Sequence, residues 1–171
     1  MTVADLEDTA EFFTSIRHLL FAVARRMLHS TAEAEDIVQD AWLRWQCCDR
    51  DAVRNPTAFL LTTTTRLCLN ELQSAHCRRE TPLGPWLPEP VDTAADPALR
   101  AERADALAAT RMVLAKLPPT ERSAYVLREA FDYPYRLIAQ SVGVSEPNAR
   151  QLVSRARKHL TAERVASATC P

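Results

Sequence analysis

Hydrophobic residues recur along most of this chain at intervals of three and four, which is the spacing of one face of an α-helix. The first such stripe predicts an amphipathic helix that ends near His29, and it comprises Phe12, Phe13, Ile16, Leu19, Leu20, Val23 and Met27. A second helix follows, with Ser30 as its N-cap and Glu33 completing a capping box. Its apolar face comprises Ala34, Ile37, Val38, Ala41, Trp42 and Trp45. We expect these two helices to pack antiparallel.

A third helix follows a polar break at residues 47–54. Asn55 and Pro56 form an N-cap with proline at the first helical position, and the helix is expected to run to about Arg79. It contains four consecutive threonines, residues 62–65. These β-branched residues are weak helix formers, so this helix must rely on tertiary packing. The three helices predict a first domain over residues 1–80.

The next interval, residues 81–98, interrupts the helical pattern. It contains five prolines and Gly84, and this density of proline cannot sustain a helix. We interpret it as a linker. With Glu80 it carries four acids and no base, which suits an electropositive channel on a partner protein. A solvated spacer explains the same composition.

Helical spacing resumes over residues 99–171, which we predict as a second domain. A helix from about Leu99 stops at Pro118, and Thr120 is expected to cap the next helix, which Pro134 ends. A short helix over residues 135–142, a turn at Gly143 and a helix capped by Ser145 complete a helix-turn-helix pattern. The buried side of the last helix comprises Ala149, Leu152, Val153, Ala156 and Leu160. The chain as a whole is therefore predicted to be all-α, with two small helical domains joined by a proline-rich linker.

Charge is distributed unevenly along the chain, although the net charge is only −1. Residues 1–53 carry ten acids and five bases, whereas residues 136–164 carry six bases and two acids. The first part should repel DNA and suit a basic protein partner, and the second suits phosphate. The exposed side of the last helix, which could enter a major groove, comprises Arg150, Gln151, Ser154, Arg155, Arg157 and Lys158. An ordinary solvated helix face would look similar.

Several other function classes lack support in the sequence. The four histidines are scattered, and there is no glycine-rich phosphate loop or nucleophile motif, so neither catalysis nor a cofactor is expected. The five cysteines lack CxxC spacing, and we expect reduced thiols and no metal site. The apolar runs are too short to cross a bilayer and the N-terminus is acidic, which together predict a cytoplasmic protein.

Two long segments resemble the extracytoplasmic-function (ECF) sigma factors of RNA polymerase. Residues 32–45, AEAEDIVQDAWLRW, resemble their region 2, and residues 122–157, which include YVLREAFDYPYRLIAQSVGVSEPNARQLVSRAR, resemble their region 4. WLPEP at residues 86–90 is similar to a linker motif of the subgroup that normally carries a SnoaL-like extension after region 4. Because the chain stops at Pro171, we expect a member without that extension.

The resemblance implies a sigma factor whose partners are core RNA polymerase and promoter DNA. Three sets of residues match family positions: Asp36, Gln39 and Asp40 for binding core polymerase, Arg66, Asn70 and Arg78 for reading the −10 element, and Arg150, Gln151, Ser154, Arg155, Arg157 and Lys158 for the −35 duplex. The loop at residues 47–54 matches the segment that holds a flipped −10 base. Asn70 stands where Asp is common and Arg66 where Asn is frequent, which leaves the −10 preference open.

Two other functions remain open at this point. One is a free-standing helix-turn-helix regulator that binds duplex DNA unaided, and the other is a helical protein-interaction module. The sequence leaves open whether an anti-sigma factor binds this chain. It also leaves open how the two domains are arranged, because a proline-rich linker does not fix the angle between them.

Overall fold

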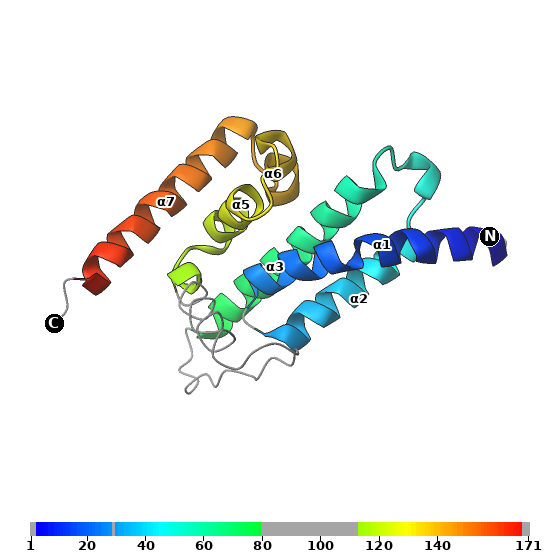
Figure 1. Ribbon diagram of the computed structural model, residues 1–171, viewed down its shortest axis with the longest axis horizontal. Coiled ribbons are helices and arrows are strands. Elements are labelled where there is room, and N and C mark those ends of the chain that lie inside the picture. Colours follow the sequence, from blue (N-terminus) through cyan, green and yellow to red (C-terminus); the bar gives the residue numbers. More distant parts are fainter. Residues whose placement is uncertain (1–2, 29, 80–112, 169–171) are drawn as a thin grey trace, which may run out of the picture.

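The computed structural model describes residues 3–28, 30–79 and 113–168, and it describes side chains within residues 9–28, 30–74 and 113–162. Every regular element in these ranges is helical (Figure 1). The elements are α1 (Val3–Met27), α2 (Thr31–Cys47), the 3₁₀ helix η1 (Arg50–Ala52), α3 (Pro56–Arg79), α5 (Pro119–Glu129), α6 (Tyr135–Val142) and α7 (Glu146–Ala168). The predicted all-α fold is confirmed. The predicted linker and most of the helix expected at residues 99–117 lie outside the described residues.

Helices α1, α2 and α3 form the first unit of the molecule, and two predicted N-caps begin helices in it. The Glu33 amide donates to the Ser30 hydroxyl at 3.3 Å, and the Ala58 amide donates to Asn55 Oδ1 at 3.0 Å. Each contact satisfies one of the backbone donors that a helix start leaves without an intrahelical partner. Helices α2 and α3 therefore begin where the sequence predicts.

The first unit is held together by an aromatic cluster that draws on all three of its helices. Trp45 of α2 is 4% exposed, and its ring centroid lies 5.9 Å from that of Phe12 of α1 and 5.8 Å from that of Phe59 of α3. Tilted aromatic pairs at this separation add to the free energy gained from burial. Trp45 therefore links α1, α2 and α3 at one point of the core.

The run of threonines in α3 is helical and mostly buried. Thr64 and Thr65 are fully buried and Thr62 is 8% exposed, so packing against neighbouring helices compensates for their weak intrinsic propensity. Among the described residues, the Thr64 and Thr65 hydroxyls have no hydrogen-bond partner. Burial without a partner carries a free-energy cost, which the surrounding packing must offset.

The second unit comprises α5, α6 and α7, and it differs from two predictions made from the sequence. Its first fully described helix, α5, begins at Pro119 with Pro118 as N-cap, so the predicted cap at Thr120 is wrong. Pro119 can occupy the first helical position because its missing N–H would have no intrahelical partner there. Helix α5 also ends at Glu129, before Pro134, because the chain turns at Asp132 with φ of 50°. Pro134 instead precedes α6 as its N-cap.

The predicted helix-turn-helix is present as α6 and α7. Gly143 adopts the left-handed conformation with φ of 78°, and its amide donates to the Ala139 carbonyl at 2.9 Å. An L-amino acid with a side chain is strained in this conformation, which explains glycine at the turn. The Asn148 amide then donates to the Ser145 hydroxyl at 3.4 Å and starts α7. The turn fixes the direction of α7 relative to α6.

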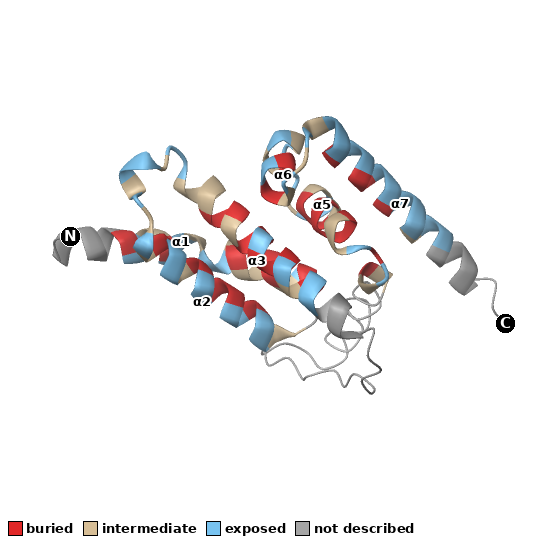
Figure 2. Cartoon of the chain, turned by 180° about the vertical axis from the view of Figure 1, so that it is seen from behind, coloured by how far each residue is buried: buried red, intermediate tan, exposed pale blue. Residues whose placement is uncertain are grey.

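The two units pack directly against each other, which settles the arrangement that the sequence left open. Helix α3 contacts both α5 and α6, and α1 contacts α5. The Thr62 and Ser141 hydroxyls lie 3.2 Å apart in a buried hydrogen bond between α3 and α6. Figure 2 shows buried positions along α3, along α5 and on the side of α7 that faces α5. The described helices therefore share one continuous core.

Arg122 of α5 is a buried cation at the junction of the units and is 5% exposed. Its guanidinium donates to the carbonyls of Met27 at 3.2 Å, Ala115 at 2.6 Å and Leu117 at 3.3 Å. The Met27 carbonyl lies at the C-terminal end of α1, where carbonyls lack intrahelical donors and the helix dipole favours positive charge. Arg122 thereby ties the end of α1 to the start of α5.

Candidate functional site

The predicted polymerase-binding residues lie together on the exposed face of α2. Asp36, Gln39 and Asp40 are exposed, whereas Ile37, Val38 and Ala41 between and beside them are buried. Leu43, one turn further along, is 50% exposed. This face therefore combines acidic groups, an amide and an apolar side chain, which suits a protein partner with a basic and partly apolar surface.

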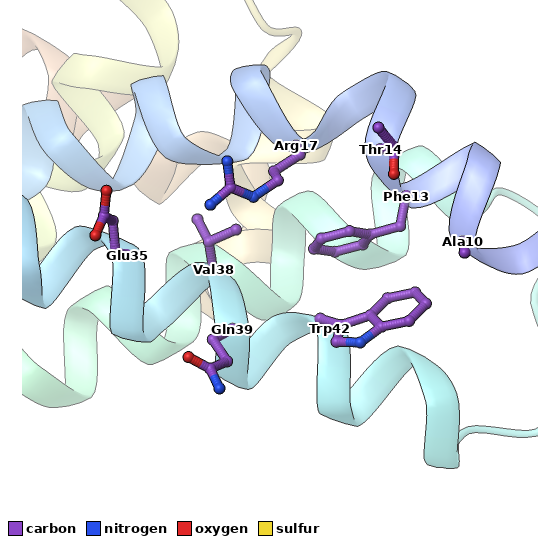
Figure 3. Close-up of a pocket in the computed structure, with 8 residues that line it drawn as sticks. All are labelled: Ala10, Phe13, Thr14, Arg17, Glu35, Val38, Gln39 and Trp42. Carbon is purple, nitrogen blue, oxygen red and sulfur yellow. The ribbon is translucent and has the colours of Figure 1, made fainter.

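A groove of about 430 Å³ runs between α1 and α2 beside these residues (Figure 3). Its lining comprises Ala10, Phe13, Thr14 and Arg17 of α1 with Glu35, Val38, Gln39 and Trp42 of α2. The rings of Phe13 and Trp42 lie 4.9 Å apart between centroids. Gln39 belongs to both the groove and the predicted binding face. Phe13 and Trp42 were predicted to lie on the apolar faces of their helices, and no pattern in the sequence indicated this groove.

The loop predicted to hold a flipped base contains η1 and is attached to α1. Arg50 Nη1 donates to the Thr9 hydroxyl at 2.7 Å, and the Val53 amide donates to the Arg50 carbonyl at 3.0 Å. Cys48 Sγ lies 3.2 Å from the Trp45 carbonyl and donates to it. These contacts give the loop a defined path between α2 and α3.

The predicted −10 residues lie along α3, and the second unit contacts one of them. Arg66 and Asn70 are both exposed and are one helical turn apart. Arg66 Nη2 donates to the Gln140 carbonyl of α6 at 3.1 Å. The side chain of Arg78 lies outside the described residues. In this arrangement, α6 engages one nitrogen of the Arg66 guanidinium, although the residue stays exposed.

The six residues predicted to contact the −35 duplex form one exposed face of α7. All of them, Arg150, Gln151, Ser154, Arg155, Arg157 and Lys158, are exposed, while Ala149, Leu152, Val153 and Ala156 are buried on the opposite side. Four of the six are cations. The structure therefore brings together the surface that an α-helix needs in order to enter a major groove and approach phosphates.

Three arginines on this face pair with carboxylates of the same unit. Arg150 Nη2 lies 2.5 Å from Glu146, Arg157 Nη2 lies 2.5 Å from Glu129, and Arg155 Nε lies 3.4 Å from Glu121. The hydrogen bond with Glu129 also raises the pKa of Arg157 above its usual value. Each arginine side chain is still more than half exposed, at 62%, 55% and 55% in residue order. These pairs limit the directions of the side chains without covering them.

Glu121 differs from the other carboxylates because it is buried, with 8% of its side chain exposed. One of its oxygens forms an ion pair with Arg155 Nε at 3.4 Å, and its other oxygen lies 3.0 Å from His159 Nδ1. Because Arg155 uses Nε for this contact, its two terminal nitrogens remain available for other acceptors. Sequence reasoning missed Glu121, whose position in the first turn of α5 gave no sign of a link to α7.

Among the described side chains, Cys47, Cys48 and Cys68 are free cysteines. Burial raises the pKa of Cys68 to about 12, and it also raises the pKa of Cys48. The side chains of Cys77 and Cys170 lie outside the described residues. Within the described side chains, no three histidine, cysteine or acidic residues come together as metal ligands would.

None of the helices in the described ranges is both long enough and apolar enough to cross a membrane.

Comparisons with known proteins match both units of the chain to one family. Residues 12–77 match Sigma-70 region 2, and residues 107–160 match Sigma-70, region 4. The chain is 47% identical to the ECF RNA polymerase sigma factor SigJ of Mycobacterium tuberculosis over 88% of its own length and 49% of the relative. It is 34% identical to the probable ECF sigma factor SigI of the same species, over 91% of this chain and 55% of the relative. The chain thus spans about half the length of the curated relatives it matches.

Solved structures agree with this assignment. The crystal structure of SigJ matches with a TM-score of 0.64 and 40% identity, covering 89% of this chain and 52% of that one. The sigma factor RpoE of Bartonella quintana, solved with the anti-sigma factor NepR, matches with a TM-score of 0.66 and covers 91% and 96% of the two chains. At 20% identity, that second likeness shows the fold alone. The matched regions together span more than half of the chain, which belongs to the extracytoplasmic-function sigma factors of the sigma-70 family.

Proposed function

We propose that this chain is a sigma factor that binds core RNA polymerase and directs promoter-specific initiation by reading −10 and −35 elements. The observation that carries this proposal is the exposed cationic face of α7, opposite a fully buried side, in a helix-turn-helix that matches Sigma-70 region 4. The same chain carries a second exposed face, on α2, with acids in place of cations. One surface suits DNA and the other suits a basic protein.

The proposed polymerase contact consists of Asp36, Gln39 and Asp40. The neighbouring groove adds an apolar surface in which the tilted rings of Phe13 and Trp42 lie beside Gln39. Interfaces between proteins commonly place aromatic residues at the centre and charges at the rim. The relatives SigJ and SigI are named as RNA polymerase sigma factors, which supports core polymerase as the partner.

The proposed promoter contacts divide between the two units. Arg66, Asn70 and Arg78 of α3, together with the loop at residues 47–54, read the −10 element as single-stranded DNA. The six exposed polar residues of α7 contact the −35 element as duplex, where the arginines can bond both bases and phosphates. This division assigns residues 1–80 to the first domain, 81–98 to the linker and 99–171 to the second domain.

Further parts of the proposal rest on family membership. WLPEP at residues 86–90 is the motif that supports the proposed membership of the subgroup with that linker. Sigma factors are not a class of enzymes, so the proposal assigns the chemistry of RNA synthesis to the polymerase. The proposed location of the chain is the cytoplasm. An anti-sigma factor is a candidate third partner, because RpoE has the same fold and was solved with NepR bound.

Run-off transcription with bacterial core polymerase and a pool of promoter fragments tests the proposal. One variant, Asp36→Ala with Gln39→Ala, removes one carboxylate and the amide from the exposed face of α2. Glu11→Gln is its control because it alters an exposed acid outside the groove. A second variant, Arg150→Ala with Lys158→Ala, removes two cations of α7. It keeps Arg155, so the buried Glu121 carboxylate retains this partner.

Specific initiation that both double variants lose and Glu11→Gln retains would support a sigma factor that uses both surfaces. Tight binding to duplex by the free chain, with no initiation under any condition, would instead indicate a free-standing regulator. Retention of function by the α7 variant would favour a protein-interaction module.

A further inference from the structure

Tyr135 is the first residue of α6 and lies between two arginines of neighbouring helices. The Arg128 guanidinium carbon of α5 and the Arg150 guanidinium carbon of α7 each lie 5.1 Å from the centre of the Tyr135 ring. A cation at this distance from an aromatic face is attracted by the negative charge of the ring face. The ring thus connects the start of the helix-turn-helix with one of the residues proposed to contact DNA.

The contact with Arg128 fixes the ring from the side of α5. Arg128 Nη1 donates to the Tyr133 carbonyl at 3.0 Å and lies 3.0 Å from Asp132 Oδ1. Its side chain is 31% exposed. Arg128 is thereby bonded to the turn that immediately precedes α6, and it presents a held cation to the Tyr135 ring.

Arg150 is held less firmly and is open to solvent. Its side chain is 62% exposed, and its contacts among the described residues are the Tyr135 ring and the Glu146 carboxylate. It lies in the first turns of α7, the part of a recognition helix that meets base edges. An arginine there can bond the two acceptors of a guanine in the major groove, provided that its guanidinium points in the right direction.

The two contacts of Arg150 respond differently to DNA. The Glu146 carboxylate carries a negative charge and is repelled by phosphates, so its hold on Arg150 competes with DNA for the same cation. The Tyr135 ring is neutral and stays compatible with nearby phosphates. A side chain that is already oriented loses less conformational freedom on binding. The ring can therefore keep Arg150 oriented in the complex, where the carboxylate is less able to do so.

We propose that Tyr135 is a positioning residue that orients Arg150 and thereby sharpens base discrimination by α7 at one position of the −35 element. This inference rests on the proposed function, because Arg150 discriminates bases only if α7 reads duplex DNA. It predicts an effect confined to the base pair that Arg150 contacts, since Tyr135 acts through Arg150.

The test measures binding of the full chain, assembled with bacterial core polymerase, to promoter fragments in which each −35 base pair is changed in turn. The variants are Arg150→Ala, Tyr135→Leu, Tyr135→Phe and the double variant Tyr135→Leu with Arg150→Ala. Tyr135→Leu removes the ring but keeps an apolar side chain, and Tyr135→Phe is the matched control that keeps the ring. The readout is the ratio of affinities for the preferred base pair and each replacement.

We expect Arg150→Ala to abolish discrimination at one base pair and Tyr135→Leu to weaken it about two- to fivefold at that same base pair, the range of an exposed cation–π contact. Tyr135→Phe should retain discrimination, and adding Tyr135→Leu to Arg150→Ala should change nothing more. A uniform loss across all positions, or additive effects in the double variant, would overturn the positioning role. If Arg150→Ala itself left binding unchanged, the proposed use of α7 would fail first.

Discussion

The two helices proposed to read DNA, α3 and α7, have opposite surroundings. Helix α3 lies at the centre of the molecule, with α1 and α2 on one side and α5 and α6 on the other. Helix α7 buries one side and exposes the other to solvent. We call the arrangement in which the two units pack against each other closed. In it, the proposed −35 surface is accessible, whereas α6 contacts Arg66 of the proposed −10 surface.

This difference has a geometric consequence for promoter binding. Elements named −10 and −35 lie about 25 base pairs apart, or about 85 Å along straight duplex at 3.4 Å per base pair. A compact chain of this length has a radius of gyration of only about 16 Å. If α3 and α7 read the two elements as proposed, the closed arrangement is too small to contact both at once, and the units must separate.

The largest expected effect is the difference in reactivity between a buried thiol on α3 and an exposed thiol introduced on α7. In a background where the other cysteines are replaced by serine, Cys68 of α3 should react with iodoacetamide far more slowly than the exposed thiol that Ser154→Cys introduces on α7. Cys68 is fully buried, which excludes the reagent, and burial also raises the pKa of its thiol to about 12, which reduces the reactive thiolate. Similar labelling rates for the two thiols in the folded chain would contradict the central position of α3.

The same thiol gives a pH dependence with a defined sign. Because the folded state raises the pKa of Cys68, its contribution to stability is complete below pH 9 and is lost as the pH rises towards 12. Urea unfolding of the chain and of Cys68→Ala should therefore differ in their pH dependence above pH 9, with the steeper loss of stability in the unmodified chain.

The next effect concerns the buried cation at the junction of the units. Arg122→Leu should lower the free energy of unfolding by roughly 3 kcal/mol, because the carbonyls of Met27, Ala115 and Leu117 lose a donor. Urea denaturation followed by circular dichroism measures it. Arg44→Ala, on the exposed part of α2, is the control and should cost less than about 0.5 kcal/mol. A cost for Arg122→Leu as small as that of the control would mean that this arginine does not hold the units together.

A disulfide between α3 and α6 tests whether α6 must move away from α3 before transcription can start. The Thr62 and Ser141 hydroxyls lie 3.2 Å apart, so Thr62→Cys with Ser141→Cys brings two thiols within reach of a disulfide. The oxidised variant should lose at least about tenfold in promoter-specific initiation and recover it on reduction, while the duplex contacts of α7 remain. Each single cysteine variant is the control under the same oxidant. Full initiation by the oxidised variant would show that the closed arrangement is compatible with promoter opening.

The smallest effect concerns the turn that directs α7. Gly143→Ala should cost about 1 kcal/mol, because an added Cβ meets nothing within 4 Å and only the φ of 78° is unfavourable. Gly143→Asn should cost less, since asparagine tolerates the left-handed conformation better. Thermal unfolding of the three chains measures the order. A cost of several kcal/mol for alanine would reveal a steric constraint that the structure does not contain.

Local signals in the sequence predicted most helix boundaries correctly, for reasons visible in single residues. Ser30, Asn55 and Ser145 cap helices because their side-chain oxygens accept from nearby amides, which requires no information about distant parts of the chain. The cap at Thr120 was wrong because Pro118 caps the helix and Pro119 occupies its first position, so the helix begins two residues earlier than predicted. Family resemblance, and not these local signals, assigned the roles of the predicted site residues.

The sequence alone determined the helical periods, the caps, the glycine turn and the concentration of cations along α7, because each depends on residues within a few positions of one another. Only the tertiary structure decided that α6 contacts Arg66, that Glu121 bonds Arg155, and that Phe13 and Trp42 line one groove. Those contacts join residues far apart in the chain, and they form because the buried faces of separate helices exclude water together. No periodicity within one helix specifies which other helix will cover it.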